Sequence, residues 1–355
     1  MAKLKADDPT VGLGGLVRGS ARRSPLSGSV LFVAGAVIFY VLVRLLTAAG
    51  VLNPYWRLIL DQSLIVTVAA LGLSLIYGFC GQFSLGHAAF YGIGAYTAGL
   101  ISKFWGHGNP VWFVVALLAG ALAAGIVAFL FGLPILRLRS DYLGIATLGF
   151  GVIVKVLMDN SNKVIPATGG ATGMTGTPTV ANFTWIFVVA VLVILLVRNL
   201  VFSRFGRAWV AMREDEVAAD AMGINTTRYK VMAFTVGCML AGLAGGLYAH
   251  RYPFVHPSSF DFLKSIDFLI IVVLGGLGSF SGTIATAIGW VFLLEGLRAV
   301  LGQAFVDYRG VVYALILTVV IILRPRGLLG GKELPLLVPA TQRARQGRKE
   351  ETPGA

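Results

Sequence analysis

Long apolar runs separated by short polar connections dominate the chain between residues 29 and 323. A helix that crosses a bilayer needs roughly 20 mainly apolar residues, so runs of this length predict an all-α integral membrane protein with about ten transmembrane helices. The predicted spans are 29–49, 58–78, 84–102, 111–136, 142–159, 183–200, 230–250, 264–278, 283–301 and 307–323.

The connection between the second and third predicted spans is unusually short, because only "GFCGQFS" separates them. This stretch is either a simple turn or part of a broken, re-entrant pair. Non-helical backbone at membrane depth is tolerated where it is buried in protein. The course of residues 78–92 therefore stays open at the level of sequence.

Basic residues gather in the tails and in alternate connections, which orients the chain by the positive-inside rule. Residues 1–28 are then a cytoplasmic tail, 29–330 the transmembrane domain with a cytoplasmic loop at 202–229, and 331–355 a second cytoplasmic tail. The glycine-rich loop 160–182 faces the opposite compartment. We expect a multi-pass protein of a bacterial inner membrane.

Composition supports a membrane protein, since 57% of the residues are hydrophobic and only 13% are charged. The formal net charge of +13 lies in tails and loops rather than on patches interleaved with aromatic residues, which argues against a nucleic-acid partner. Cys80 and Cys238 each lie inside an apolar run, so we interpret them as core residues without a disulfide or metal.

One polar segment interrupts this pattern, "FGRAWVAMREDEVAADAMGIN" at 205–225. Its periodicity predicts a helix over 214–223, ended by Gly223. The apolar face of that helix is Val217, Ala218, Ala221 and Met222. A helix this short is marginal alone in water. It therefore packs against its own bundle or a cytoplasmic partner, or it lies on the membrane surface.

Two segments of the chain share a spaced pattern, "GFCGQFSLGHAAFYG" at 78–92 and "GGLGSFSGTIATAIG" at 275–289. The common pattern G-x-x-G-x-F-S-x-x-x-A-x-x-x-G indicates a parallel internal repeat or a chance similarity between glycine-rich helices. The polar residues in and near these segments either line a translocation pathway or form hydrogen bonds between helices. They are Gln82, Ser84, His87 and Ser281.

Signatures of catalysis are missing from the sequence. No G-x-x-x-x-G-K-[ST] occurs, so energy from nucleotide must come from partner subunits. No H-E-x-x-H occurs, and "GSFSG" at 278–282 has Phe280 where a nucleophile elbow needs serine. We expect no catalytic, metal or cofactor site in this chain. Few ionisable residues lie within spans, which disfavours an ion-coupled carrier, although Asp267 and Glu295 leave it open.

Several blocks of the sequence resemble the LivM-type permease subunits of branched-chain amino acid ABC importers. The blocks are "GQFSLGHAAFYGIGAYTAGL", "LRSDYLGIATLGFGVIVKVLMDN", "TGGATGMTGTP", "GRAWVAMREDEVAADAMGINTTRYKVMAFTVGCMLAGLAGGLYA" and "VVLGGLGSFSGTIATAIG". In addition, "VAADAMG" at 217–223 resembles the E-A-A-x-x-x-G coupling loop of importer permeases, with Val217 in place of its glutamate.

The resemblance implies a permease that works by alternating access and carries leucine, isoleucine or valine. It implies a second related permease, two cytoplasmic ATPase subunits that bind ATP and Mg, and a periplasmic substrate-binding protein. Relatives with this architecture also carry urea or short amides. The residues expected to couple to the ATPase are Arg207, Glu214, Asp215, Glu216, Ala218, Ala219 and Gly223. The loop 168–178 either docks the binding protein, through Thr168, Gly169, Gly170, Thr172 and Gly173, or is a flexible connector.

Overall fold

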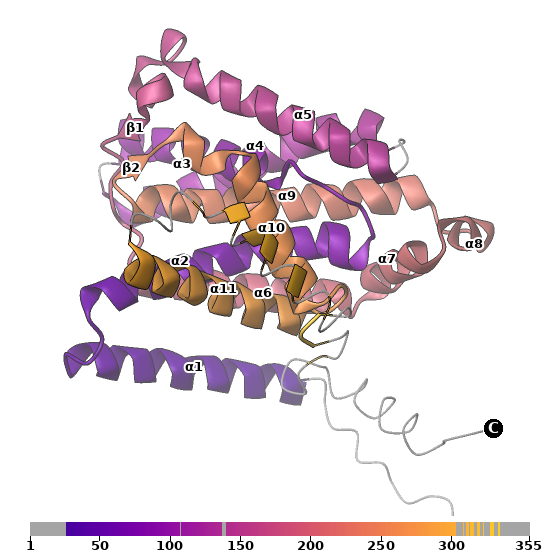
Figure 1. Ribbon diagram of the computed structural model, residues 1–355, viewed down its shortest axis with the longest axis horizontal. Coiled ribbons are helices and arrows are strands. Elements are labelled where there is room, and N and C mark those ends of the chain that lie inside the picture. The colour runs from indigo at the N-terminus through magenta and orange to yellow at the C-terminus, as the bar shows by residue number, and fades with distance from the viewer. Residues whose placement is uncertain are drawn as a thin grey trace, which may run out of the picture.

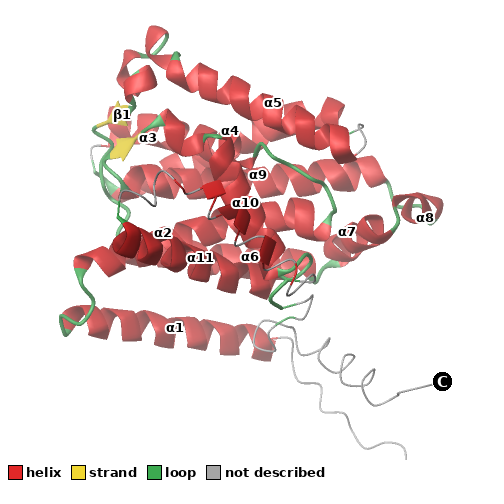
Figure 2. Cartoon of the chain, viewed as in Figure 1, coloured by secondary structure: helices red, strands yellow, loops and turns green. Residues whose placement is uncertain are grey.

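A computed structural model places most of the chain in a bundle of helices (Figures 1 and 2). It describes residues 26–106, 108–136 and 140–302, together with 308, 310–311, 313–315, 318–319, 322, 327–329 and 333. The residues outside this description include about half of the predicted span 307–323, the tail 1–28 apart from its last three residues, and nearly all of 331–355.

The α-helices, in chain order, are α1 (Leu26–Ala48), α2 (Pro54–Leu73), α3 (His87–Ile101), α4 (Pro110–Ile135), α5 (Ser140–Asp159), α6 (Phe183–Val201), α7 (Arg204–Glu214), α8 (Glu216–Ala221), α9 (Thr226–Arg251), α10 (Phe262–Gly275) and α11 (Phe280–Leu301). Short π-helices η1 (Ser74–Phe79) and η2 (Ser102–Gly106) extend α2 and α3. The 3-10 turns are η3 (Ser161–Lys163), η4 (Pro166–Thr168), η5 (Gly170–Thr172) and η6 (Pro257–Phe260). The strands are β1 (Met174–Thr175) and β2 (Phe254–Val255).

Six helical segments in the described part of the chain are long and apolar enough to cross a membrane. They are Pro54–Phe79, Pro110–Ile135, Tyr142–Asp159, Phe183–Val201, Thr226–Arg251 and Phe280–Ala299. The predicted spans 84–102 and 264–278 are helical, but α3 has 15 residues and α10 has 14. At 1.5 Å per residue α10 is only about 21 Å long, less than the hydrocarbon thickness of a bilayer, whereas η2 extends α3 to Gly106.

The centre of the bundle is α2, whose most apolar window is 94% buried, whereas that of α5 is 28% buried. Helix α9 crosses α2, α3 and α4 at close range because glycines meet at the crossings. A Cβ added to Gly94 of α3 would lie 2.0 Å from the carbonyl oxygen of Gly242 in α9. Small residues at crossings are the usual means of close helix packing in membranes.

Helix α3 begins in the middle of the bundle. His87 at its start places Nε2 2.9 Å from the carbonyl oxygen of Ala69, ten residues before the end of the α2 extension. The chain therefore leaves that extension, turns back into the protein over residues 81–86, and only then forms α3. The Ala88 amide donates to Ser265 Oγ at 3.0 Å, so the first turns of α3 and α10 meet. This settles the open course of 78–92 as a broken, re-entrant segment.

The bundle has two different ends (Figure 1). Helices α7 and α8 lie at one end, and β1, β2 and the 3-10 turns of the loop 160–182 lie at the other. The antiparallel pairing of Met174 with Val255 ties that loop to the segment after α9. Lys103 Nζ donates to the carbonyl oxygens of Ala167 and Thr175, each at 2.9 Å.

Candidate functional site: the polar module and the broken span

The polar module, residues 202–229, consists of two helices where the sequence analysis predicted one over 214–223. Asp215 separates them: its backbone is extended, and its Oδ1 accepts hydrogen bonds from the amides of Val217 and Ala218 at 2.9 and 3.0 Å. An aspartate that satisfies two free amides is a typical N-cap. The prediction missed this break because Asp215 was treated as one of several surface charges.

Helix α7 is anchored to the bundle by a large aromatic side chain. Trp209 is completely buried, and its Nε1 donates to the carbonyl oxygen of Tyr229 at 3.0 Å. Gly206 lies so close to Val201 that an added Cβ would be 1.9 Å from the Val201 carbonyl oxygen. These contacts make α7 a firmly packed element, so a displacement of α7 would also act on the start of α9.

Arg213, at the end of α7, contacts both segments that share the spaced glycine pattern. Its Nη1 donates to the carbonyl oxygen of Gly78 at 2.7 Å. Gly81 and Gly278 occupy equivalent repeat positions, both have positive φ (75° and 82°), and both lie against the Arg213 side chain. The sequence analysis did not select Arg213. Two features of the sequence could have pointed to Arg213: it directly precedes the acidic residues Glu214, Asp215 and Glu216, and the shared pattern contains the matched glycines Gly81 and Gly278.

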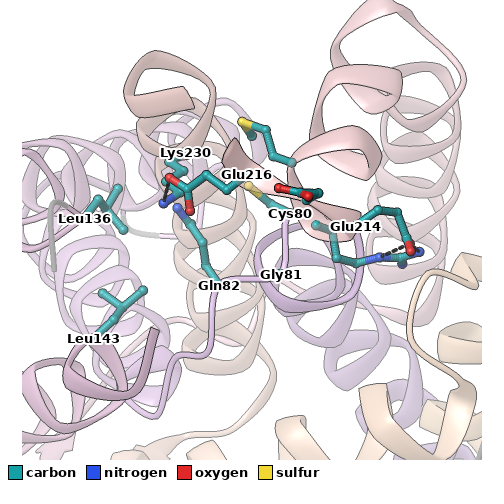
Figure 3. A pocket seen from close by; sticks show the side chains of 11 residues that line it. Cys80, Gly81, Gln82, Leu136, Leu143, Glu214, Glu216 and Lys230 are labelled. Carbon is teal, nitrogen blue, oxygen red and sulfur yellow. Dashed lines mark hydrogen bonds and ion pairs between the residues drawn. The ribbon is translucent and has the colours of Figure 1, made fainter. Parts of the chain in front are cut away.

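A cavity of about 280 Å³ lies between the module and the broken span (Figure 3). Its walls come from the re-entrant segment, the end of α4, α5, the module and the start of α9. The lining residues are Cys80, Gly81, Gln82, Leu136, Leu143, Met212, Arg213, Glu214, Asp215, Glu216 and Lys230. Figure 3 shows the Gln82 side chain pointing toward the ion pair of Glu216 and Lys230, whose oxygen and nitrogen are 2.5 Å apart.

Neither Gln82 Oε1 nor Gln82 Nε2 has a hydrogen-bond partner among the described residues, although the side chain is buried. The neighbouring Cys80 side chain is also buried and packs as a small core group. Buried amide groups nearly always have a partner in the protein or in ordered water, so we expect the Gln82 amide to bind water in the cavity.

The residues predicted to couple to an ATPase fall into two groups. Arg207, Ala218 and Gly223 are exposed, and Gly223 has φ of 84° with open space around it. Glu214 pairs with Arg213 at 2.6 Å, Glu216 with Lys230 of α9, and Asp215 caps α8, so these three acidic side chains have partners within this chain.

The side chain of Ala219, which was also expected to couple to an ATPase, is covered within this chain. Ala219 is 4% exposed and faces the bundle, because Val217 and Met222 take the opposite side of α8. Those two side chains are 80% and 84% exposed. The predicted apolar face of Val217, Ala218, Ala221 and Met222 is therefore exposed, and no described residue covers it.

All four residues predicted for a pathway are buried: Gln82, Ser84, His87 and Ser281. His87 is held by the Ala69 carbonyl, which fits the interhelical hydrogen-bonding alternative. Ser281 lies at the start of α11, where its hydroxyl and amide donate to the carboxylate of Glu333. The structure thus places Ser281 at the contact with the C-terminal segment, while Gln82 lines the cavity beneath the module.

The loop predicted to meet a binding protein is ordered by its own hydrogen bonds. Thr168 receives a bond from Ser161 Oγ at 2.7 Å and donates to the Ile165 carbonyl. Of the five predicted residues, Thr172 is exposed and Gly169 is half-buried, whereas Thr168, Gly170 and Gly173 are buried and shape the loop. Exposed apolar side chains at this end include Val164, Ile165 and Phe254.

Comparison with known proteins identifies the family of this chain. The family described as "Branched-chain amino acid transport system / permease component" matches residues 55–321, which include the re-entrant segment, the module and most of the bundle. The chain belongs to this permease family. The match covers both repeat copies, so the contact between Arg213 and their glycines lies within the part that the family shares.

Individual members of the permease family are similar over most of the chain. The high-affinity branched-chain amino acid transport system permease protein LivM of Salmonella typhimurium is 36% identical over 305 residues, which is 76% of this chain and 69% of that protein. LivM of Escherichia coli is 34% identical over 333 residues, 84% of this chain and 74% of that protein. LivH of Salmonella typhimurium is 28% identical over 291 residues, which is 75% of this chain and 91% of that protein. No solved structure matches the chain.

Proposed function

We propose that this chain is the permease subunit of an ATP-driven importer that carries leucine, isoleucine and valine across the bacterial inner membrane. The observation that carries the proposal is the family match over residues 55–321, with LivM proteins as relatives on most of the chain. Similarity to both LivM and LivH supports pairing with a second, related permease. Two ATPase subunits, holding ATP and Mg, and a periplasmic binding protein complete the assembly.

The proposed orientation puts the polar module and both termini in the cytoplasm. The positive-inside rule supports this, because the basic residues of the chain concentrate at the tails and the module. The loop 160–182 then faces the periplasm, with Val164 and Ile165 exposed toward a docking binding protein. We retain ten spans in this proposal, two of them the partial helices α3 and α10, with residues 307–323 as the last.

In the proposed mechanism α8 is the coupling helix. Its exposed apolar side chains Val217 and Met222 insert into a groove of the ATPase subunit, and Arg207 and Ala218 contact the rim. ATP-driven closure displaces α8 together with α7. Arg213 carries the displacement to Gly78 and to the turn at Gly278, where the broken span begins. Packed elements shift between discrete arrangements, so this movement can switch access from one side to the other.

Uptake into vesicles tests the proposal. Vesicles that hold this chain and its genomic neighbours receive ATP and labelled leucine, with urea measured in parallel. ATP-dependent leucine accumulation supports both the class and the substrate. Accumulation of urea alone keeps the architecture and overturns the substrate, since related importers carry urea or short amides. Accumulation driven by an ion gradient without ATP overturns the coupling mechanism and identifies a stand-alone secondary transporter.

A further inference from the structure

A second cavity, of about 170 Å³, lies on the far side of the broken span from the polar module. We call it the polar cavity, because hydroxyl, amide or charged side chains make up its whole lining. They come from α2, α3, α9, η6 and α10, and are Gln62, Tyr91, Tyr248, Ser258, Ser259, Asp261, Lys264 and Asp267. Ionisable residues inside a membrane bundle are costly and are usually retained for function.

Three polar atoms on this wall have no hydrogen-bond partner within the described part of the chain: Tyr91 OH, Asp267 Oδ1 and Gln62 Oε1. Tyr91 is 1% exposed and Asp267 is 5% exposed. Buried polar groups nearly always have a partner, either in the protein or in bound water. Three unmatched atoms on one cavity therefore indicate that water or a polar ligand completes the site.

The charges of the polar cavity select among ligands. Lys264 Nζ is 3.3 Å from Asp267 Oδ2, which leaves Oδ1 of the same carboxylate unpaired. Asp261 adds a second carboxylate, one oxygen of which caps α10 by accepting from the Lys264 amide. A simple anion would meet two carboxylates, and a simple cation would meet Lys264. A zwitterion satisfies both signs, because its ammonium and carboxylate groups are bound by opposite partners.

The position of the cavity favours the same ligand. It lies where the first turns of α3 and α10 meet, at the contact of the Ala88 amide with Ser265 Oγ. The N-terminus of a helix carries partial positive charge, and transporters use the ends of partial helices at the middle of the membrane to bind charged substrate groups. A neighbouring cavity of about 250 Å³ shares Asp261 and offers the apolar side chains of Leu85, Leu148, Val152 and Leu263.

We propose that the polar cavity binds the α-ammonium and α-carboxylate groups of an amino acid as it passes through this subunit. Asp267 Oδ1, Gln62 Oε1 and Tyr91 OH receive the ammonium group. Lys264 and the hydroxyl group of Ser259 hold the carboxylate. The aliphatic side chain extends toward the apolar cavity beyond Asp261. This inference rests on the proposed function as an amino-acid importer and assigns the residues that recognise the part common to all its substrates.

Binding is tested by protection of a thiol in the complete importer. Ser258 is exposed and borders the cavity, so Ser258→Cys introduces a reactive group, with Cys80 and Cys238 replaced by alanine. Leucine is expected to slow modification of that thiol at least about threefold. Leucinamide, which lacks the carboxylate, and 4-methylpentanoate, which lacks the ammonium, should give no protection. The proposal is overturned if all three compounds protect the thiol equally or if leucine does not protect it.

Transport by variants separates ligand binding from a structural role. Asp267→Asn and Lys264→Met are each expected to lower leucine uptake at least about tenfold and to abolish protection by leucine. The double variant Lys264→Met with Asp267→Leu replaces the ion pair by apolar groups, which commonly preserves or raises stability. A purely structural pair predicts recovery of uptake in the double variant, and that recovery overturns the proposal. Continued loss of uptake, with the assembled complex intact, supports it.

A matched control is the pair Glu295 and Arg298 on α11, also spaced three residues apart, with atoms 3.8 Å apart. Replacing it by Gln and Met should leave uptake within about twofold of the unmodified importer. Leucine uptake by the unmodified complex tests the proposed function separately from the cavity assignment. If the unmodified complex takes up leucine but leucine does not protect Ser258→Cys, the importer stands and the cavity assignment fails. If the complex takes up no leucine, the proposed function fails.

Discussion

Arg213 Nη1 donates a hydrogen bond to the carbonyl oxygen of Gly78 at 2.7 Å, which joins the polar module to the end of the α2 extension. The same side chain lies against Gly81 and Gly278, the equivalent glycines of the internal repeat. One residue of the module thus touches both turns from which the broken span and α11 begin. Any movement of α7 reaches both turns together.

Replacement of Arg213 tests this connection directly. A hydrogen bond to a charged group contributes about 1.5–3 kcal/mol, so Arg213→Met should reduce ATP-driven uptake about tenfold or more. The ATPase should still hydrolyse ATP at its basal rate, because Arg213 lies within the permease. Stimulation by the loaded binding protein is the quantity to measure. Arg204→Met, on the same helix but with an exposed side chain, is the control.

Gly278→Ala should reproduce the effect of losing Arg213. A Cβ at Gly278 would lie 2.4 Å from Arg213 Nη1, so the guanidinium must move away. The positive φ of Gly278, 82°, adds a cost of about 1–2 kcal/mol for an L-residue. Gly108 has φ of 85° and open space, so Gly108→Ala has the backbone cost alone. The unfolding temperature should fall in both variants, whereas uptake should fall only in Gly278→Ala. Equal uptake in the two would refute the connection.

The sequence predicted the position of most helices, because apolar runs identify membrane segments whatever their neighbours are. It did not predict how deep in the bundle α3 and α10 begin, because that depth depends on tertiary contacts of His87 with Ala69 and of Ala88 with Ser265. The matched glycines were visible in the repeat, but their common partner, Arg213, lies far away in sequence. Helical periodicity identified the exposed apolar face of Val217, Ala218, Ala221 and Met222, but it did not predict the break at Asp215 that separates α7 from α8.

The exposed apolar side chain of Val217 should decide assembly with the ATPase. Val217→Asp puts a charge on the face of α8 that the proposed groove must desolvate, so copurification of the ATPase subunit should be lost while the permease remains folded. Val164 on the loop 160–182 is equally exposed, at 83% against 80%. Val164→Asp should retain the ATPase and lose stimulation by the binding protein. Loss of the ATPase in both variants would contradict the two separate surfaces.

The crossing of α3 and α9 should be intolerant of any side chain. A Cβ on Gly94 would lie 2.0 Å from the Gly242 carbonyl oxygen, and backbone cannot move aside as a flexible side chain can. Overpacking costs about 1–3 kcal/mol in ordinary cores, so Gly94→Ala should destabilise the bundle by ~3 kcal/mol. Gly289→Ala, on α11 with no atom within 4 Å, should change stability by less than ~1 kcal/mol. Thermal unfolding of the purified permease in detergent gives both values.

The contact between Glu333 and α11 should depend on pH. The Glu333 carboxylate accepts hydrogen bonds from the amides of Phe280 and Ser281 at 2.8 and 3.0 Å, and from the Ser281 hydroxyl. Burial nevertheless raises the pKa of Glu333 above its ordinary value of 4.5, and these bonds oppose the rise only in part. The folded state then holds the proton more tightly than the unfolded state.

A carboxyl group with a raised folded pKa contributes most stability at acid pH and loses it as pH rises from 4.5 through the folded pKa. The unfolding temperature of the wild-type chain minus that of Glu333→Gln should therefore be larger at pH 4.5 than at about pH 7.5. Glu333→Gln has no ionisation at this position and supplies the reference for all other titrating groups. A difference that grows with rising pH would mean that the hydrogen bonds outweigh burial and that the carboxylate is the preferred form.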